Sequence, residues 1–474
     1  MNASRPGVRR IIVDCTFIAP HPAPTGIPRV VEKYVVHGAA VAARAGVELI
    51  PAEFAQDGFH RRAAVEINTP ARSAPRSNPL FRVWLEAVRY GSRVILQGAN
   101  LVAALFPLRP VKKTMLAVAQ WAADLVPNIR HRATARRKVG ERIELGEGDI
   151  LFCPGYWHDM EMEAYEAARA GGAEVVFLVH DILPVTMPTF YQYPWRQDFA
   201  QRLSRSFSTV SHYYCISQQT LSQVRAYGEW QGHAVRGSIA YNGFDPAPER
   251  VTGAARLDDG VADLLARRPW LMVGTLEPKK GHADVIAALE HLWGEGYERP
   301  LVIVGRHGWM SEPIVDSIKN SPWLGTHLFW FEGLDDASLA AFYEGAHALL
   351  FGSLAEGFGL PLLEAISHST PVIARNTLVA REILGEEGAY FSDMKELVAR
   401  ILEMEAPATL AALRANATRL SWYRWAEVVE AVVTDLLRTP ADRRQDAALL
   451  AGVSRESVAP GPEAQTSPRR KAMA

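Results

Sequence analysis

The 474-residue sequence has few cysteines and no large excess of charge of either sign. Cys15, Cys153 and Cys215 lie far apart, without the spacing of a disulfide framework or a zinc site. We therefore expect three reduced thiols in a cytoplasmic protein. Lysine and arginine (51) nearly balance aspartate and glutamate (52). This balance argues against a general nucleic-acid binder, which normally carries a net basic face.

The sequence also lacks a long hydrophobic run. No uninterrupted apolar stretch reaches the roughly 18 residues of a membrane-spanning helix. The nearest candidate, residues 94–108, is uncharged but is broken by Gln97, Gly98, Asn100 and Pro107. The apolar run near the N-terminus is too short for a secretory signal, so we expect no export.

Two regions of the sequence alternate strand-like apolar runs with helical patterns. This β-α-β rhythm is typical of parallel sheets covered by helices on both faces. The predicted fold class is therefore α/β, with two doubly wound, Rossmann-like domains. Strands are expected at residues 10–15, 47–54, 149–153, 174–179 and 212–216, and again at 271–275, 301–305, 327–331, 348–352, 371–375 and 389–391.

Breaks in this rhythm indicate the domain limits. We assign residues 1–250 to an N-terminal domain and residues 251–420 to a second domain. The polar, small and charged residues at 246–268 suit a linker between them. After Arg438 the composition shifts to proline, alanine, serine and charge, which predicts a disordered tail at 439–474.

An insertion at about 69–148 interrupts the first region, and its stretch at 109–142 is strongly basic. Apolar residues such as Trp121 alternate with the basic ones. One interpretation is a peripheral contact with anionic lipid at the inner face of the membrane. The other, which we favour, is a solvated helical insertion packed on its own domain. The basic residues include Lys112, Lys113, Arg130, Arg132, Arg136, Arg137 and Lys138.

The segment EGFGLPLLE, from Glu356 to Glu364, follows an expected strand and has the sharpest chemical pattern. Gly357 and Gly359 allow the backbone to approach a ligand, and Pro361 suits the first turn of a helix. The amides and positive dipole end of that helix attract an anion such as a diphosphate. Either glutamate alone would only favour the helix dipole. The pair flanking a glycine-rich loop indicates a site that also binds sugar hydroxyls.

Two further loops leave strands at the sheet edge where open α/β folds bind ligands. The loop GTLEPKKG starts at Gly274 and offers the cations Lys279 and Lys280. The turn VGRHGW at 304–309, which contains Arg306, is placed to frame a nucleotide base. Taken alone, each loop is compatible with an ordinary connection.

Together, a glutamate, seven intervening residues and a second glutamate, preceded by GTLEPKKG and VIVGRHGW, resemble the retaining glycosyltransferases of family 4, which have the GT-B fold. The match in order and spacing covers about residues 270–393. Weaker matches are TGIPRV around Gly26 and the pair His180-Asp181 at the end of an expected strand. The resemblance implies an acceptor-side first domain facing a donor domain across a cleft. It also implies a helix at 421–438 that crosses back onto the first domain.

The resemblance implies a role for each matched residue. Lys280 would neutralise the donor diphosphate, Glu364 would hold the nucleotide ribose, and Glu356 would hold the donor sugar hydroxyls. His180 would reach across from the first domain, so His180, Lys280 and Glu356 form the catalytic set. Many members carry arginine where this chain has Thr275, and Lys279 is the candidate replacement. The donor-binding set is Gly26, Thr275, Lys279, Arg306, Gly357, Phe358, Gly359, Leu360 and Glu364.

Transfer from a nucleotide sugar develops negative charge on the leaving diphosphate, and fixed cations with a helix N-terminus stabilise that charge without a metal ion. We therefore expect no metal and no cofactor besides the nucleotide-sugar co-substrate. The pair His158-Asp159 lacks the further ligands that a metal needs.

The three loops look most like mannosyltransferases of polysaccharide and O-antigen assembly. This resemblance implies transfer of mannose from GDP-mannose to a glycan or lipid-linked acceptor. The alternatives are another nucleotide sugar as donor, or a non-catalytic GT-B relative that binds a glycan or nucleotide. Retention of Lys280, Glu356 and Glu364 argues against the second alternative.

Overall fold

The computed structural model describes residues 8–16, 18, 26–55, 58–62, 140–245, 259–386, 388–445, 447–450 and 454–455. Most of the predicted insertion at 69–148, including the basic stretch up to residue 139, lies outside the described residues. The last part of the predicted tail, 456–474, lies outside them too.

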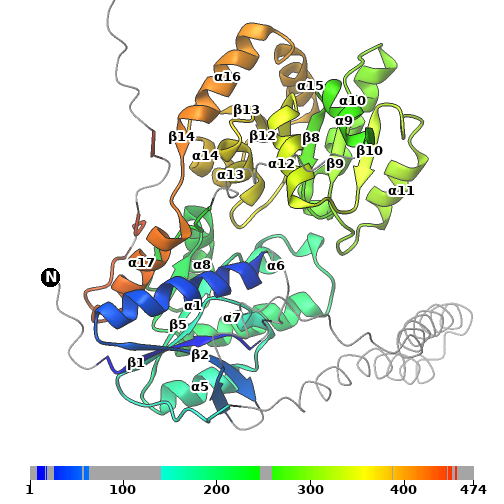
Figure 1. Cartoon of the computed structure of the whole chain (residues 1–474). Helices are drawn as coiled ribbons and strands as arrows, with labels where there is room; N and C mark the ends of the chain where they lie inside the picture. Colours follow the sequence, from blue (N-terminus) through cyan, green and yellow to red (C-terminus); the bar gives the residue numbers. More distant parts are fainter. Residues whose placement is uncertain are drawn as a thin grey trace, which may run out of the picture.

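The N-terminal half of the described chain forms a seven-stranded sheet with strand order β3-β2-β1-β4-β5-β6-β7. Neighbouring strands run parallel, apart from the antiparallel pair β2 and β3 at one edge. Helices α1 and α5 lie on opposite faces of this sheet (Figure 1). The strands are β1 (Arg10–Asp14), β2 (Glu48–Ala55), β3 (Gly58–Arg61), β4 (Asp149–Cys153), β5 (Glu174–Val179), β6 (His212–Cys215) and β7 (Gly237–Ile239). The helices are α1 (Ile27–Arg44), α5 (Met162–Ala170), α6 (Leu183–Thr186), α7 (Trp195–Thr209) and α8 (Gln218–Trp230), with 3-10 turns η1 (Trp157–Asp159) and η2 (Pro188–Phe190).

The second half forms a six-stranded, wholly parallel sheet with strand order β10-β9-β8-β11-β12-β13. The strands are β8 (Trp270–Val273), β9 (Leu301–Val304), β10 (Leu328–Phe331), β11 (Ala348–Phe351), β12 (Val372–Arg375) and β13 (Ala389–Phe391). The helices are α9 (Asp259–Ala266), α10 (His282–Gly294), α11 (Glu312–Asn320), α12 (Asp336–Gly345), α13 (Leu360–Ser367), α14 (Leu378–Leu384), α15 (Met394–Glu403) and α16 (Pro407–Arg419), with the 3-10 turn η3 (Pro278–Lys280).

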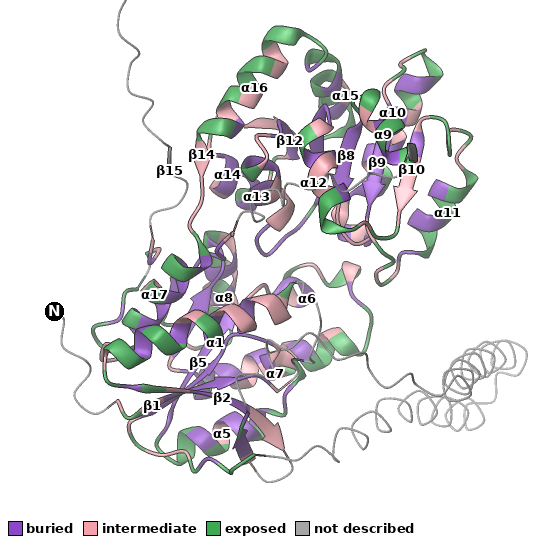
Figure 2. Cartoon of the chain, in the orientation of Figure 1, coloured by how far each residue is buried: buried purple, intermediate pink, exposed green. Residues whose placement is uncertain are grey.

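The central strands are buried on both faces, which explains their near-continuous apolar sequences. All six residues of β5, EVVFLV, are buried, and so are all five of β4. Burial in both domains follows the strands and the sheet-facing sides of the helices (Figure 2). The predicted α/β class with two Rossmann-like domains is confirmed.

The order of the second sheet creates a topological switch point between β8 and β11, because connections from these neighbours run in opposite directions along the sheet. Open α/β sheets bind ligands at the carboxyl ends of the strands beside such a point. The loops GTLEPKKG and EGFGLPLLE follow β8 and β11, so the fold brings the two predicted motifs to one crevice.

After α16 the chain passes through the short strand β14 (Leu420–Ser421) and returns to the N-terminal domain as α17 (Trp425–Leu436). Helix α17 lies beside α1 (Figure 1). Val433 and Val429 of α17 lie at ordinary contact distance from Gly38 of α1, since a methyl group added there would lie 3.5 and 3.7 Å from them; its nearest neighbour would be Leu49 of β2 at 2.9 Å. The C-terminal helix therefore joins the core of the first domain.

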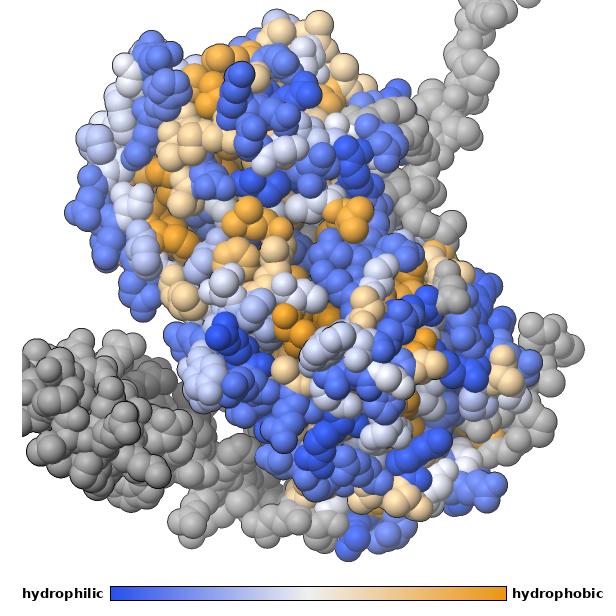
Figure 3. Space-filling view, turned by 180° about the vertical axis from the view of Figure 1, so that it is seen from behind, coloured by the Kyte–Doolittle hydropathy of each residue, from blue (hydrophilic) through white to orange (hydrophobic). Residues whose placement is uncertain are grey.

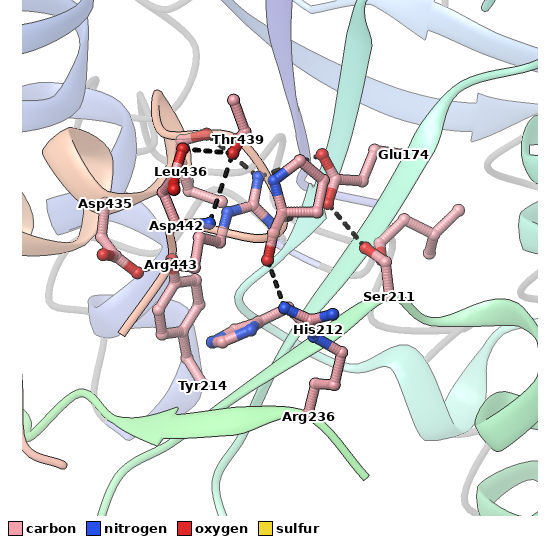
Figure 4. Close-up of polar contacts among 12 residues, drawn as sticks. Glu174, Ser211, His212, Tyr214, Arg236, Asp435, Leu436, Thr439, Asp442 and Arg443 are labelled. Atoms are coloured by element: carbon pink, nitrogen blue, oxygen red, sulfur yellow. Dashed lines mark hydrogen bonds and ion pairs between the residues drawn. The ribbon is translucent and has the colours of Figure 1, made fainter. Parts of the chain in front are cut away.

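The predicted disordered tail is wrong for residues 439–445 and 447–450, which pack against the N-terminal domain. Arg443 is buried and donates two hydrogen bonds to the carboxylate of Glu174, of 2.7 and 3.0 Å (Figure 4). Farther on, the Leu449 amide donates to the carbonyl oxygen of Ile239 at the β7 edge, at 2.9 Å. The composition of this segment predicted disorder because charged residues such as arginine are usually solvated. Arg443 is instead buried, since it pairs with the buried Glu174. Residues 454–455 form β15 (Ser454–Arg455), which pairs antiparallel with β14.

The predicted linker at 246–268 is also partly wrong, because its second half contains α9. Val261 and Leu264 of this helix are buried, although the surrounding sequence is polar. Within the described residues, no helix is both long and apolar enough to cross a membrane. Cys15, Cys153 and Cys215 are buried and form no disulfide.

Candidate active site

The two predicted loops of the C-terminal domain contact each other directly. Gly281 follows η3 with a φ of 71°, and a methyl group there would lie 2.2 Å from the carbonyl oxygen of Gly352. This approach requires glycine on both conformational and steric grounds. The Leu354 amide also donates to the Lys279 carbonyl oxygen at 2.7 Å. The backbone therefore fixes the lysines of one loop against the glutamate of the other.

The charged centre of the site consists of Lys279, Lys280 and Glu356. Lys280 Nζ lies 2.5 Å from Glu356 Oε1, and Ser353 donates its hydroxyl to the same oxygen at 2.7 Å. Lys279 Nζ lies 3.8 Å from Glu356 Oε2 and 3.7 Å from Glu277 Oε2. Lys279, Glu277 and Glu356 are buried. Two cations and two carboxylates thus lie in contact with one another, largely shielded from solvent.

The pairing of opposite charges favours the ionised forms of Glu356 and Lys279. Burial alone would raise the pKa of Glu356, but the charges of Lys280 and Lys279 reverse this effect and lower it to about 2. Burial would lower the pKa of Lys279, but the carboxylates of Glu356, Asp181 and Glu277 raise it instead. The pKa of Glu277 is raised, mainly by burial. Lys279 is therefore held as a cation beside Glu356.

Helix α13 begins next to this cluster. Its N-cap, Gly359, has a φ of 96°, which a side chain rarely adopts. One turn inside the helix, Glu364 accepts a hydrogen bond of 2.6 Å from the Tyr343 hydroxyl. Burial raises the pKa of Glu364, whereas the Tyr343 hydrogen bond and the charge of Arg29, from the N-terminal domain, act in the opposite direction. The helix therefore presents its N-terminus and a half-buried carboxyl group close to the opposing domain.

His180 lies across the domain junction against the glycine-rich loop. A methyl group at Gly357 would lie 2.2 Å from the His180 carbonyl oxygen and 3.1 Å from Asp181 Cβ. The His180 side chain donates from Nε2 to the Pro154 carbonyl oxygen at 2.9 Å. Burial lowers the pKa of His180, which favours a neutral imidazole whose Nδ1 can accept a hydrogen bond.

Phe358, Leu360 and Gly26 are three more of the predicted donor-binding residues. The Phe358 ring is buried against Tyr241 and Trp422, with centroid distances of 6.3 and 5.7 Å, so it packs the junction. Leu360 starts α13, and Gly26 is the N-cap of α1 with a φ of 65°.

The loops after β8 and β9 lie side by side at the edge of the site. The Leu276 amide donates to the Arg306 carbonyl oxygen at 2.9 Å, while the Arg306 side chain is exposed. A methyl group at Gly308 would lie 2.7 Å from the side chain of Thr275. The structure thus gathers Lys279, Lys280 and Glu356 tightly and leaves Arg306 at the rim.

The sequence did not indicate several residues that shape the site. Glu277 belongs to the loop GTLEPKKG, and a glutamate so close to two lysines could have suggested that it pairs with them. Tyr191 and Trp309 come from different domains, with ring centroids 5.5 Å apart, and Trp309 Nε1 donates to the Phe190 carbonyl oxygen at 2.9 Å. No local pattern could have predicted these contacts, because they depend on how the domains meet.

The hydropathy of the surface varies near the junction between the two domains, where the charged cluster lies. Seen from behind, the molecule is mostly hydrophilic, and apolar side chains gather in small patches that include the region where the two domains meet (Figure 3). Among the described residues, no group of three or more histidine, cysteine, aspartate or glutamate side chains is arranged to hold a metal ion.

Two Rossmann-like domains with a charged site at their junction define the GT-B fold. Within this chain, residues 267–419 match the family model of glycosyl transferases group 1. The structure is similar to that of an α,α-trehalose 6-phosphate synthase from Burkholderia multivorans, with a TM-score of 0.53 over 93% of this chain and 97% of that chain. The identity is 14%, so this likeness shows the fold alone.

Two curated relatives share more sequence. The chain is 33% identical over 280 residues to the serotype-specific mannosyltransferase WbdA of Escherichia coli, which covers 57% of this chain and 34% of that protein. It is 32% identical over 139 residues to the O-antigen chain mannosyltransferase B of Escherichia coli, covering 28% of this chain and 35% of that protein. The chain thus spans about a third of the length of these relatives.

Proposed function

We propose that this protein is a retaining, family 4 glycosyltransferase that transfers mannose from GDP-mannose to a glycan or lipid-linked acceptor in polysaccharide synthesis. The observation that carries the proposal is the cluster of Lys279, Lys280 and Glu356, which lies beside the N-terminus of α13 and opposite His180. The names of the relatives, both mannosyltransferases, support the choice of sugar.

The cluster suits a leaving group that gains negative charge. When the bond between the sugar and the diphosphate breaks, the charge developing on the phosphate oxygens meets two lysines and the positive dipole end of α13. Glu356 holds both lysines in the site before a diphosphate binds. This chemistry requires no metal ion, and we propose that the nucleotide sugar is the only co-substrate.

Glu356 is better suited to orienting groups than to attacking the sugar. Its carboxylate is paired with Lys280 at 2.5 Å, and its pKa of about 2 makes it a weak base. We therefore assign the proton of the acceptor hydroxyl to an oxygen of the departing diphosphate, on the same face of the sugar. The acceptor oxygen forms the new bond to the sugar carbon as the old bond breaks, which retains the anomeric configuration.

The test is a panel of nucleotide sugars with released nucleotide as the readout. With mannose oligosaccharides as acceptor, GDP-mannose should release GDP in the presence of EDTA, while UDP-glucose and UDP-N-acetylglucosamine should not. Lys280→Ala should lower turnover about 100-fold or more, as loss of one oxyanion-stabilising group does. Lys319→Ala, at an exposed position of α11, is the matched control and should retain activity. Near-normal transfer by Lys280→Ala would overturn the assignment.

For the location of the enzyme we propose the cytoplasm, and for residues 109–142 we favour a solvated insertion over a peripheral contact with the inner face of the membrane. Neutralising Arg130, Arg132, Arg136, Arg137 and Lys138 should therefore leave binding to vesicles of anionic phospholipid unchanged, whereas weaker binding would favour the membrane contact. Unchanged partitioning between the vesicles and the supernatant would reject this contact.

A further inference from the structure

An aromatic surface leads away from the charged cluster along the domain junction. Lys279 Nζ lies 5.9 Å from the ring centroid of Trp309, and the Trp309 ring contacts Tyr191 at 5.5 Å. Tyr191 in turn stacks on Trp195, with centroids 5.8 Å apart and planes 26° from parallel. The rings therefore form a continuous path from the proposed donor site to the surface of the first domain.

The rings at both ends of this path are exposed to solvent, Trp309 by 40% and Trp195 by 39%, and the neighbouring Tyr193 is 65% exposed. A folded chain normally buries large rings, and a group of exposed ones marks an interaction site. These rings come from two domains and from positions more than 100 residues apart. We call the three contacting rings, Trp309, Tyr191 and Trp195, together with the exposed Tyr193 between the last two in the sequence, the aromatic path.

The path is anchored firmly enough to hold a ligand. Trp309 Nε1 donates to the Phe190 carbonyl oxygen, and Tyr191 packs with Leu183 and Ala355 in a small apolar cluster that spans the junction. Trp195 also packs on Phe199 at 5.7 Å. Rings fixed in this way lose little conformational freedom when a ligand binds.

The surroundings of the path favour a sugar over a lipid. Polar residues alternate with the rings, as in the sequence FYQYPWRQD at 190–198, and Gln192, Gln197 and Asp198 are exposed. The Arg196 guanidinium lies over the Tyr193 ring at 5.9 Å. A sugar ring offers an apolar C–H face for stacking and hydroxyl groups for such polar neighbours, whereas an acyl chain would bury the polar groups without partners.

We propose that the aromatic path is a binding subsite for the acceptor glycan, which holds sugar units beyond the one that receives the transferred residue. The proposal rests on the proposed function, because the end of the glycan that receives the sugar is placed at the proposed donor site, where the path starts. It predicts that longer acceptors bind better than short ones, because only they reach Trp195 and Tyr193.

Binding is measured first without any nucleotide sugar, by titrating fluorescently labelled mannobiose and mannohexaose into the full chain. Wild type should bind mannohexaose more tightly than mannobiose. Tyr193→Ala and Trp309→Ala should each weaken mannohexaose binding up to about tenfold, since an aromatic contact contributes about 0.5–1.5 kcal/mol. Tyr193→Phe should restore it, and Trp230→Ala is the control, because Trp230 is 76% exposed on α8 and lies outside the path.

The outcomes separate this proposal from the proposed function. Wild-type affinity of Tyr193→Ala and Trp309→Ala for mannohexaose, or no binding by the wild-type protein, would overturn the subsite even if transfer from GDP-mannose occurs. Loss of mannohexaose binding in these variants, with no transfer from any donor, would support the subsite and reject the proposed function. Loss of binding to anionic vesicles with unchanged mannohexaose binding would assign the rings to lipid and overturn the subsite.

Discussion

Replacing Arg443 by alanine should destabilise the protein strongly, because it removes one partner of a buried ion pair. The side chain of Arg443 is 0% exposed and that of Glu174 is 6% exposed. Arg443 donates two hydrogen bonds to the carboxylate and a third, of 3.0 Å, to the Leu436 carbonyl oxygen (Figure 4). The three bonds tie the C-terminal segment and the end of α17 to the start of β5.

The expected loss is about 3–5 kcal/mol, the usual cost of leaving one charge of such a pair buried without its partner. The matched control is Arg44→Ala. Arg44 of α1 pairs with Glu430 of α17 at 2.7 Å, and both side chains are more than half exposed. An exposed pair of this kind contributes at most about 1 kcal/mol. Both pairs hold the C-terminal part of the chain to the N-terminal domain, and the Arg443 pair is buried whereas the Arg44 pair is exposed.

The assay is urea-induced unfolding followed by circular dichroism, with the free energy of unfolding extrapolated to water. A double variant, Arg443→Met with Glu174→Met, should recover most of the stability, because apolar side chains of similar volume can replace a buried pair. Equal losses for Arg443→Ala and Arg44→Ala would refute the reasoning, since they would show that burial of the Arg443 pair has no energetic consequence.

Three further predictions concern the site. Glu356 has a lowered pKa, so its contribution to stability is present above about pH 4.5 and is lost as the pH falls toward 2. The difference in free energy of unfolding between wild type and Glu356→Gln, measured by urea titration, should therefore shrink over this range. Gly357→Ala should reduce transfer while each domain stays folded, because the new methyl group would meet the His180 carbonyl oxygen; unaltered kcat/KM would contradict the close approach. Glu382→Gln should loosen the domain junction, because this carboxylate accepts hydrogen bonds of 2.9 and 3.0 Å from the first two amides of α8. The expected result is faster proteolysis at the junction, and an unchanged rate would argue against the contact.

Much of the fold could be predicted because parallel strands buried on both faces leave continuous apolar runs in the sequence. The short edge strand β3 has no such run, since only two of its four residues are buried, and it was missed. Helix α9 was missed for a different reason: most of its eight residues, DGVADLLA, are apolar, but they follow directly on polar and charged residues and were assigned with them to the linker.

The site was predictable as far as it lies within one sheet. The loops after β8 and β11 had to meet, because their strands are neighbours at the switch point, and this placed Lys280 near Glu356. Contacts between domains were not predictable in this way. The proximity of Arg29 to Glu364, and that of Trp309 to Tyr191, depends on how two separate cores are oriented.

The positive charge of the loop after β8 comes from its two lysines. Thr275 of this loop packs beside Gly308 and is uncharged, so the cations of the cluster are Lys280 and Lys279. Lys279 is buried between Glu277 and Glu356, so its charge is retained only because two carboxylates compensate for its loss of solvent. A diphosphate that binds here would compete with Glu356 for both lysines. Donor affinity should therefore depend on the acidic residues of the cluster as well as on the basic ones.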